Sequence, residues 1–289
     1  MSGSTRVLLL GGAGFLGRAI LSRVRAFPDL DVDYADLGRI DSHSARFVPV
    51  DVLSREACIR VLPDYDFIIN LTGQITSPTN LAFRLNTEGV DHIVGAIRDT
   101  STRLLHVSSV AVYGRSEAPV TESTSINPET PYAAFKAASE YLIQQSLDDA
   151  RRCTFRLSNL FGLGQEKGVV AYLLRFQDAD DPLRFNNDGK LVRYFLHVQD
   201  AADALLKAVD ISASGVYNVV GSDRYVLRDL VALVERISGI TRTVIYDGPP
   251  PWENVRTFDT LRSNSLFGAV PAGRLESFIK HYLADNDEG

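Results

Sequence analysis

Tyr132 and Lys136 stand four residues apart in the segment Pro131-Tyr132-Ala-Ala-Phe-Lys136, where a helix is expected to begin. Side chains at this spacing share one face of a helix, so the phenol and the ammonium group would be neighbours. A nearby cation favours the phenolate, and we expect Lys136 to lower the pKa of Tyr132 towards the working pH. Tyr132 could then move a proton on a hydroxyl or keto carbon. Taken alone, the pair would also suit two exposed residues of a surface helix.

Two serines, Ser108 and Ser109, follow the apolar run at 104–107. Ligands bind beyond the carboxyl ends of the strands in open α/β sheets, which is where these serines would lie. A hydroxyl there can hydrogen-bond the reacting oxygen and orient it for proton transfer. Serines at strand ends are also common turn formers, so a chemical role for Ser109 depends on its partnership with Tyr132.

A glycine-rich turn, with Gly11, Gly14 and Gly17, follows the first apolar run and opens a stretch of helical spacing. Glycines permit a tight turn, close approach of the backbone to a pyrophosphate and close packing of helix against strand. The amides at the start of the helix, around Phe15 and Leu16, would face phosphate oxygens. A turn of this kind between a strand and a helix predicts a dinucleotide-binding site.

Acidic residues after the second and third expected strands would complete this site. Asp36 is best placed to accept hydrogen bonds from the adenosine ribose, and Asp33 is the alternative. A carboxylate there repels a 2′-phosphate, so we expect NAD as the cofactor; NADP stays open because Arg39 is close in sequence. Asp51 and Val52 would meet the adenine, although Asp51 could equally form a turn or cap a helix.

Strand-like and helix-like segments alternate over the first part of the chain. This alternation predicts an α/β fold, a Rossmann-type doubly wound parallel sheet with right-handed crossovers. The expected strands are 7–10, 32–35, 47–50, 66–70, 104–107 and 153–157, and the expected helices include 80–98 and 132–147.

The alternating pattern loosens from about residue 161, which predicts a smaller C-terminal α/β part that binds the substrate. We expect a dinucleotide-binding domain at 1–160, completed by about 192–220. The substrate-binding part would comprise 161–191 and 221–289.

Composition excludes several classes of partner. The chain has 289 residues, of which 45% are hydrophobic, and a formal net charge of -6. No run of Lys or Arg exceeds two residues, so neither nucleic acid nor a membrane is expected as a partner. No apolar run approaches the roughly 18 residues of a membrane span. Cys58 and Cys153 lack metal-ligand spacing, so we expect buried thiols, no metal site and a cytoplasmic protein.

Together these motifs resemble the extended short-chain dehydrogenase/reductase family of nucleotide-sugar epimerases, dehydratases and ketoreductases. The resemblance spans most of the chain, from residue 7 to about residue 259. It implies that Ser109, five positions before Gly114, is catalytic together with Tyr132 and Lys136. Lys136 would also hold ribose hydroxyls of the nicotinamide half of the cofactor.

The same resemblance implies residues that bind a nucleotide-diphosphate sugar. Asn86 is similar to the asparagine of the family's Asn-x-x-Gly segment near the active site, and Asn159 to the asparagine of Arg-x-x-Asn-x-x-Gly. Arg193 resembles a phosphate-binding arginine, a role that suits the paired donors of a guanidinium. Arg256 offers a later contact to phosphate, whereas His197 is expected to support the fold.

The family's 4,6-dehydratases carry two acids in the serine strand, where this chain has Val110 and Ala111, so elimination of water is not expected. The leading hypothesis is an NAD-dependent 4-epimerase that works through a transient 4-keto sugar. The alternative is an NAD(P)H-dependent reductase of 4-keto-deoxysugars. A third hypothesis, from another class, is a non-catalytic dinucleotide-binding regulatory protein. The resemblance also implies a homodimer.

Overall fold

The computed structural model describes residues 4–41, 45–74, 76–175, 182–249 and 252–287. The remaining residues of the expected domains, at 1–3, 42–44, 75, 176–181, 250–251 and 288–289, lie outside the described residues.

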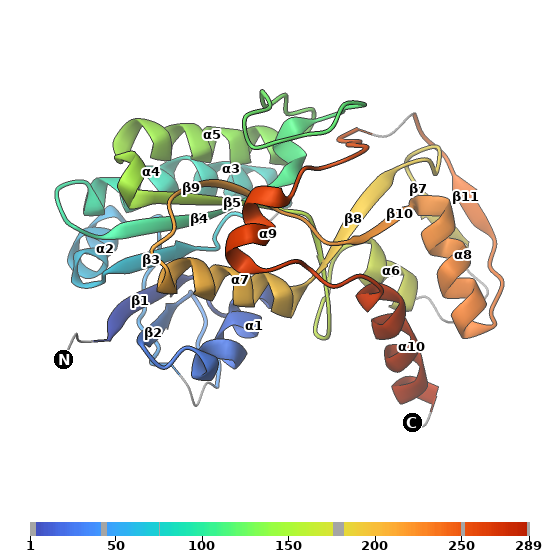
Figure 1. Cartoon of the computed structure of the whole chain (residues 1–289), viewed down its shortest axis with the longest axis horizontal. Coiled ribbons are helices and arrows are strands. Elements are labelled where there is room, and N and C mark those ends of the chain that lie inside the picture. The colour runs from blue at the N-terminus through green and yellow to red at the C-terminus, as the bar shows by residue number, and fades with distance from the viewer. Residues whose placement is uncertain (1–3, 42–44, 75, 176–181, 250–251, 288–289) are drawn as a thin grey trace.

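Six parallel strands form the main sheet, in the order β2-β1-β3-β4-β5-β9 (Figure 1). Five of the six predicted strands are therefore confirmed, and so is the α/β fold with a doubly wound parallel sheet. The strands of this sheet are β1 (Thr5–Leu10), β2 (Leu30–Ala35), β3 (Phe67–Asn70), β4 (Arg103–Ser109), β5 (Arg152–Leu157) and β9 (Gly215–Val219).

Helices cover both faces of this sheet, which explains why most residues of its strands are buried. Successive side chains of a strand point to opposite faces, so Leu9 packs with α1 and α7, whereas Leu8 and Leu10 pack with α2, α4 and α5. Figure 1 shows α1 and α7 below the sheet and α4 and α5 above it. The helices are α1 (Phe15–Arg23), α2 (Arg55–Val61), α3 (Thr79–Asn86), α4 (Glu88–Ile97), α5 (Pro131–Ser146) and α7 (Val198–Asp210).

A smaller part with its own core stands beside the main sheet. Phe161, Phe195 and Leu230 are among the buried residues of this core. Its strands form a three-stranded sheet, β10-β8-β6, and a two-stranded sheet, β11-β7. The elements of this part are β6 (Asn159–Phe161), α6 (Val169–Arg175), β7 (Leu183–Phe185), β8 (Val192–His197), β10 (Asp223–Val226), α8 (Leu227–Ser238), β11 (Val244–Tyr246) and α10 (Arg274–Asp287).

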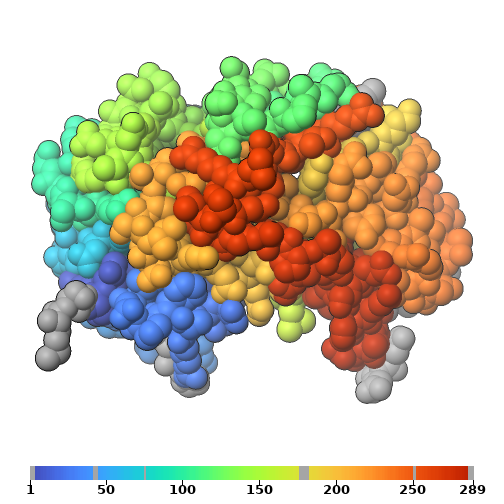
Figure 2. All heavy atoms as spheres, viewed as in Figure 1, coloured from blue at the N-terminus to red at the C-terminus, as the bar shows by residue number. Residues whose placement is uncertain are grey.

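The chain crosses between the two parts several times. After β5 it builds β6 to β8, and then returns to the main sheet through α7 and β9. The segment expected to complete the dinucleotide-binding domain is therefore divided, because β8 pairs with β6 and β10 while β9 pairs with β5. Towards the C-terminus, α9 (Leu261–Phe267) packs on α7 and β9, and Figure 2 shows the orange-red and red chain lying across the junction.

The strand expected at 47–50 is a wrong prediction. Phe47 forms only an isolated bridge with Tyr34 of the edge strand β2, and the amide of Val48 donates to the carbonyl of Tyr34 at 2.9 Å. Pro49 has no amide hydrogen to donate, so the ladder ends after these contacts.

The helical stretch expected at 80–98 is confirmed, but it is divided into two helices, α3 and α4, which meet at Thr87. The hydroxyl of Thr87 donates to the carbonyl of Phe83 at 2.7 Å, and its backbone leaves helical geometry, with φ -118° and ψ -77°. Threonine side chains that bond back by one turn bend helices. The helix expected at 132–147 is confirmed as α5.

Cys58 and Cys153 are both buried and unpaired, as expected. Within the described residues, no cluster of three or more His, Cys, Asp or Glu side chains is arranged to hold a metal ion. No helix in the described ranges combines the length and apolar content that crossing a membrane requires.

Candidate active site

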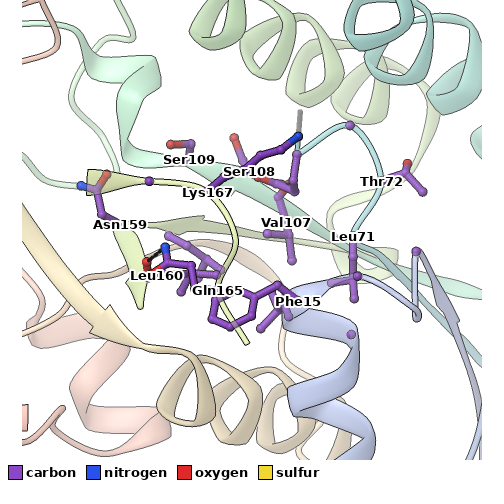
Figure 3. Close-up of a pocket in the computed structure, with 18 of the residues that line it drawn as sticks. Phe15, Leu71, Thr72, Val107, Ser108, Ser109, Asn159, Leu160, Gln165 and Lys167 are labelled. Carbon is purple, nitrogen blue, oxygen red and sulfur yellow. Dashed lines mark hydrogen bonds between the residues drawn. The ribbon is translucent and has the colours of Figure 1, made fainter. Parts of the chain in front are cut away.

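A cleft of about 1160 Å³ opens where the carboxyl ends of the main strands face the smaller part (Figure 3). In Figure 3, Phe15, Leu71 and Thr72 lie on one side of this cleft, Asn159 on the other, and Ser108 and Ser109 between them. Most of the predicted site residues line it: Gly11, Gly14, Phe15, Leu16, Gly17, Asp36, Asp51, Val52, Ser109, Tyr132, Asn159 and Arg193.

The glycine turn fits a dinucleotide phosphate for reasons visible in its packing. Gly11 has φ +84°, which disfavours any side chain. A Cβ on Gly17 would lie 2.4 Å from the carbonyl oxygen of Gly12, so only glycine lets α1 pack this closely. Gly14 caps α1, and no side chain accepts a hydrogen bond from the first amides of that helix. These amides are therefore available to phosphate oxygens.

Asp36 lies at the end of β2 and lines the cleft. Its carboxylate accepts hydrogen bonds from the amides of Ala13, at 3.0 Å, and Leu37, at 2.7 Å. Each oxygen retains capacity for a further donor such as a ribose hydroxyl. Asp33, the alternative for the ribose, instead accepts hydrogen bonds from the guanidinium of Arg46 at 2.6 Å and from the hydroxyl of Tyr65.

Asp51 and Val52 also line the cleft. Asp51 accepts a hydrogen bond from the amide of Leu53 at 2.9 Å. The side chain that caps α2 is Ser54, so the helix-cap alternative for Asp51 is wrong, while its turn-forming contact remains.

Tyr132 occupies the first turn of α5 because its neighbours begin the helix there. Thr130 caps the helix through its hydroxyl, and Pro131 takes the first position, where its missing amide hydrogen costs nothing. The hydroxyl of Tyr132 donates to Oε1 of Gln74 at 2.6 Å, and Nε2 of Gln74 donates to the carbonyl of Val107 at 2.7 Å. The phenol is thereby held at the end of β4.

The surroundings of Tyr132 act on the pKa of its phenol in both directions. Burial raises the pKa of its phenol, and the negative charge of Glu253 raises it further, while hydrogen bonding with Ser109 acts in the opposite direction. Lys136 is fully buried, and its ammonium donates to the carbonyls of Thr72, at 3.2 Å, and Val107, at 3.1 Å.

Lys136 does not line the cleft itself, and burial lowers its pKa to about 7, with the charge of Glu140 opposing the shift. An unfolded chain keeps this lysine protonated up to about pH 10.5. Above about pH 7 the unfolded state therefore binds more protons than the folded state. The free energy of unfolding consequently increases as the pH rises.

We therefore predict that the unfolding free energy of the wild type, relative to that of Lys136→Met, increases by about 2 kcal/mol between about pH 7 and pH 9. Urea titrations of dinucleotide-stripped protein at several pH values measure this difference. A difference that stayed constant over the range would mean that Lys136 keeps an ordinary pKa.

A buried polar network packs against β4, the strand that ends with Ser108 and Ser109. Ser108 donates to Glu140 at 2.5 Å, and the guanidinium of Arg156 pairs with the same carboxylate at 2.6 Å. Arg156 also donates to the hydroxyl of Tyr113 at 2.6 Å, which in turn donates to Asn218 at 2.8 Å. The network joins β4, β5, α5 and β9, and so fixes the strand end that presents Ser109.

Two predicted substrate contacts are not supported by the geometry. Asn86 is buried away from the cleft, where its amide donates to the carbonyls of Gly73 and Ala82 at 3.0 and 2.8 Å. Its role is to hold the loop that carries Gln74. Arg256 lies outside the cleft, two-thirds exposed, and pairs with Glu117 at 3.0 Å.

Asn159 and Arg193 stand on the smaller part's side of the cleft. Asn159 is exposed, with one weak contact of 3.4 Å to the carbonyl of Tyr194, so its amide is free to meet a ligand. Arg193 donates to the carbonyl of Glu253 at 2.7 Å, and burial lowers the pKa of its guanidinium while Glu253 opposes the shift.

Three cleft residues were missed by reasoning from sequence. Gln74 follows β3, and its position at a strand end was a usable signal. Lys167 reaches across the cleft in Figure 3 and makes no ion pair among the described residues. Glu253 comes from an irregular segment near the C-terminal end of the chain, and no local sequence pattern predicts its place in the cleft.

Comparisons with known proteins agree with this geometry. The model of the NAD dependent epimerase/dehydratase family matches residues 7–220. A UDP-glucose 4-epimerase of Azospirillum brasilense is 26% identical, over 97% of this chain and 92% of its own length. A dTDP-glucose 4,6-dehydratase of Mycobacterium tuberculosis is 28% identical, over 80% of this chain and 78% of its own. The crystal structure of UDP-glucuronic acid 4-epimerase from Bacillus cereus, in complex with UDP-glucuronic acid and NAD, superposes with a TM-score of 0.84. It shares 19% identity and covers 98% of this chain and 100% of that one.

Proposed function

Because this chain belongs to the NAD dependent epimerase/dehydratase family, we propose that it is a nucleotide-sugar 4-epimerase working through a transient 4-keto sugar. Members of the family are NAD-dependent nucleotide-sugar enzymes of the extended short-chain dehydrogenase/reductase type, so the chain is an enzyme. The observation that carries the proposal is that Ser109, Tyr132, Asn159 and Arg193 line the same cleft as the glycine turn.

The dinucleotide half of the cleft fits NAD. The uncapped amides of Phe15 to Gly17 would hold the pyrophosphate, and Asp36 would accept hydrogen bonds from the adenosine ribose. Bound NAD would supply a hydride acceptor and donor. A carboxylate at Asp36 also disfavours a 2′-phosphate, which supports NAD over NADP.

In the substrate half, Tyr132 would exchange a proton with the sugar oxygen at C4. Ser109 would hydrogen-bond the same oxygen and fix its direction. Tyr132 must give up its proton before it can act as a base, and a positive charge on Lys136, one turn further along the same helix, would favour that step. Arg193 would bind the diphosphate, whose remote binding energy positions the reacting carbon.

The composition of the serine strand favours epimerisation over dehydration. Val110 and Ala111 follow Ser109 along the wall of the cleft, and neither can donate or accept a proton. The UDP-glucose 4-epimerase of Azospirillum brasilense, which aligns over nearly its whole length, also supports this choice.

The second candidate is a 4-ketoreductase, and the observation that favours it is that the hydroxyl of Tyr132 acts as a hydrogen-bond donor, to Oε1 of Gln74 at 2.6 Å. A phenol that keeps its proton suits donation to a keto oxygen. Such an enzyme would consume reduced dinucleotide in every turnover. Membership of an enzyme family leaves the regulatory alternative without support.

The test supplies UDP-glucose, UDP-galactose and their dTDP counterparts to the purified enzyme without added dinucleotide. We expect each C4 epimer to yield the other until equilibrium, as resolved by chromatography. Absence of interconversion, together with oxidation of NADH or NADPH on a 4-keto sugar nucleotide, would contradict the epimerase and support the ketoreductase.

The two arginines expected at the diphosphate make a matched pair of variants. Arg193→Ala removes a charged donor from the cleft and should raise KM about 10- to 100-fold. Arg256→Ala removes only an exposed ion pair and should leave KM within about twofold. Steady-state kinetics with the accepted sugar nucleotide measure both, and equal effects would contradict the assignment of Arg193.

A cytoplasmic homodimer remains a proposal. Phe83 of α3 and Tyr141 of α5 are 50% and 62% exposed, and Phe83 packs edge-on against Phe135 of α5. Exposed aromatic side chains on adjacent helices support association through this pair of helices. Light scattering on the purified protein would give the assembly's mass.

A further inference from the structure

Glu253 lies in the wall of the cleft, and its amide, its carbonyl and its carboxylate each form a hydrogen bond. Its amide donates to Glu129 at 2.9 Å, and its carbonyl accepts from Arg193 at 2.7 Å. Its carboxylate accepts a hydrogen bond from the hydroxyl of Thr130, the residue that caps the helix of Tyr132. The position of the carboxylate is thus fixed before any ligand arrives.

The backbone at this position is unfavourable for glutamate. Glu253 has φ +55°, in the left-handed region where glycine is at ease and other residues are strained. Among the described residues, Ser212 is the other non-glycine residue with positive φ, and it lies in a surface turn. Strain that is held by surrounding contacts in the wall of a cleft points to a role for the side chain.

The carboxylate of Glu253 lies between two residues that line the substrate half of the cleft. One of its oxygens is 3.8 Å from a guanidinium nitrogen of Arg193, the residue assigned to the diphosphate. At its other side, the carboxylate accepts a hydrogen bond from Thr130, two residues before Tyr132, the residue assigned to the reacting carbon. A sugar that reaches from Arg193 to Tyr132 must therefore pass beside Glu253.

A fixed carboxylate that is only 15% exposed is poorly screened by solvent. It accepts hydrogen bonds from sugar hydroxyls, and it repels a second carboxylate brought against it. Solved neighbours with this fold include an enzyme for UDP-glucuronic acid, whose sugar carries a carboxylate, so the fold leaves the choice open.

We propose that Glu253 sets the substrate class, so that the cleft accepts uncharged hexoses and rejects hexuronates. This inference rests on the proposed function, because it assumes a nucleotide sugar in the cleft. It does not depend on which reaction follows at C4.

Equilibrium binding separates the inference from the reaction. The affinities of NAD-loaded enzyme for UDP-glucose and UDP-glucuronic acid, and for the same pair of dTDP sugars, are measured by calorimetry. We expect the wild type to prefer the glucose form by about tenfold or more. Glu253→Gln, which keeps the shape and removes the charge, should reduce that preference to about twofold, mainly through tighter uronate binding.

A second variant of Glu253 and a control variant test whether the effect is due to the charge of Glu253. Glu253→Gly suits the positive φ and should fold at least as well as the wild type, yet it should show the same loss of preference. Glu117→Gln removes an exposed carboxylate outside the cleft, 83% exposed, and should retain the full preference.

Equal affinities in the wild type, or a preference that survives both changes at Glu253, would overturn the inference. Failure of every sugar nucleotide to bind would overturn it together with the proposed function. Preferential binding of glucose forms that is lost in both Glu253 variants, without interconversion at C4, would uphold the inference and reject only the epimerase.

Discussion

Tyr132→Phe is expected to lower kcat by about 10²- to 10⁴-fold while leaving the affinities for NAD and for the sugar nucleotide unchanged. The change removes the hydroxyl that donates to Gln74 and would carry the substrate's proton, and it keeps the ring in place. Because the helix start depends on Thr130 and Pro131, α5 should fold as before. Single-turnover kinetics at saturating substrate measure the chemical step directly.

Tyr141→Phe is the matched control for this prediction. It removes the same atom from the same helix, at a residue that is 62% exposed and outside the cleft. Its kcat should equal that of the wild type. If Tyr132→Phe also retained wild-type kcat, the proton transfer would have to belong to another group.

Glu140→Ala is expected to lower the unfolding free energy by about 3–5 kcal/mol. Glu140 is buried with Arg156, their side chains being 10% and 7% exposed, so removal of the carboxylate leaves an unpaired buried charge. Ser108 loses its acceptor as well. Chemical denaturation of variant and wild type at the same pH measures the difference.

The ion pair of Arg84 and Glu88 provides the control, because its members are 50% and 41% exposed and separated by one helical turn. Glu88→Ala should cost about 0.5 kcal/mol or less. If Glu140→Ala lowered the unfolding free energy no more than Glu88→Ala, the network of Glu140, Arg156 and Ser108 would contribute no more to stability than an exposed ion pair.

Local patterns were sufficient for most strands of the main sheet and for the glycine turn and Asp36 that line the cleft. A run such as Leu8 to Leu10 must be buried on both faces, and a glycine turn after it leaves few alternatives. Asp36 could be predicted because a strand end has a fixed place in a parallel sheet. The strand at 47–50 failed because Pro49 prevents the ladder from continuing.

The substrate half was less predictable because Glu253 comes from a segment with no regular pattern. Arg256 is three positions from Glu253, yet one pairs with a surface residue and the other lines the cleft. Only the path of the chain between β11 and α9 decides which of them faces inward. The effect of burial on the pKa of Tyr132 could not be predicted from sequence either, because burial is a property of the whole packing.

The central claim is that the chain carries out a redox reaction that is closed within its own cleft. The most direct measurement purifies the protein without added nucleotide, denatures it and identifies the released cofactor by chromatography and absorbance. We predict stoichiometric NAD, retained through purification by the glycine turn and Asp36. Release of no dinucleotide, together with failure to bind NAD added in large excess, would contradict the account.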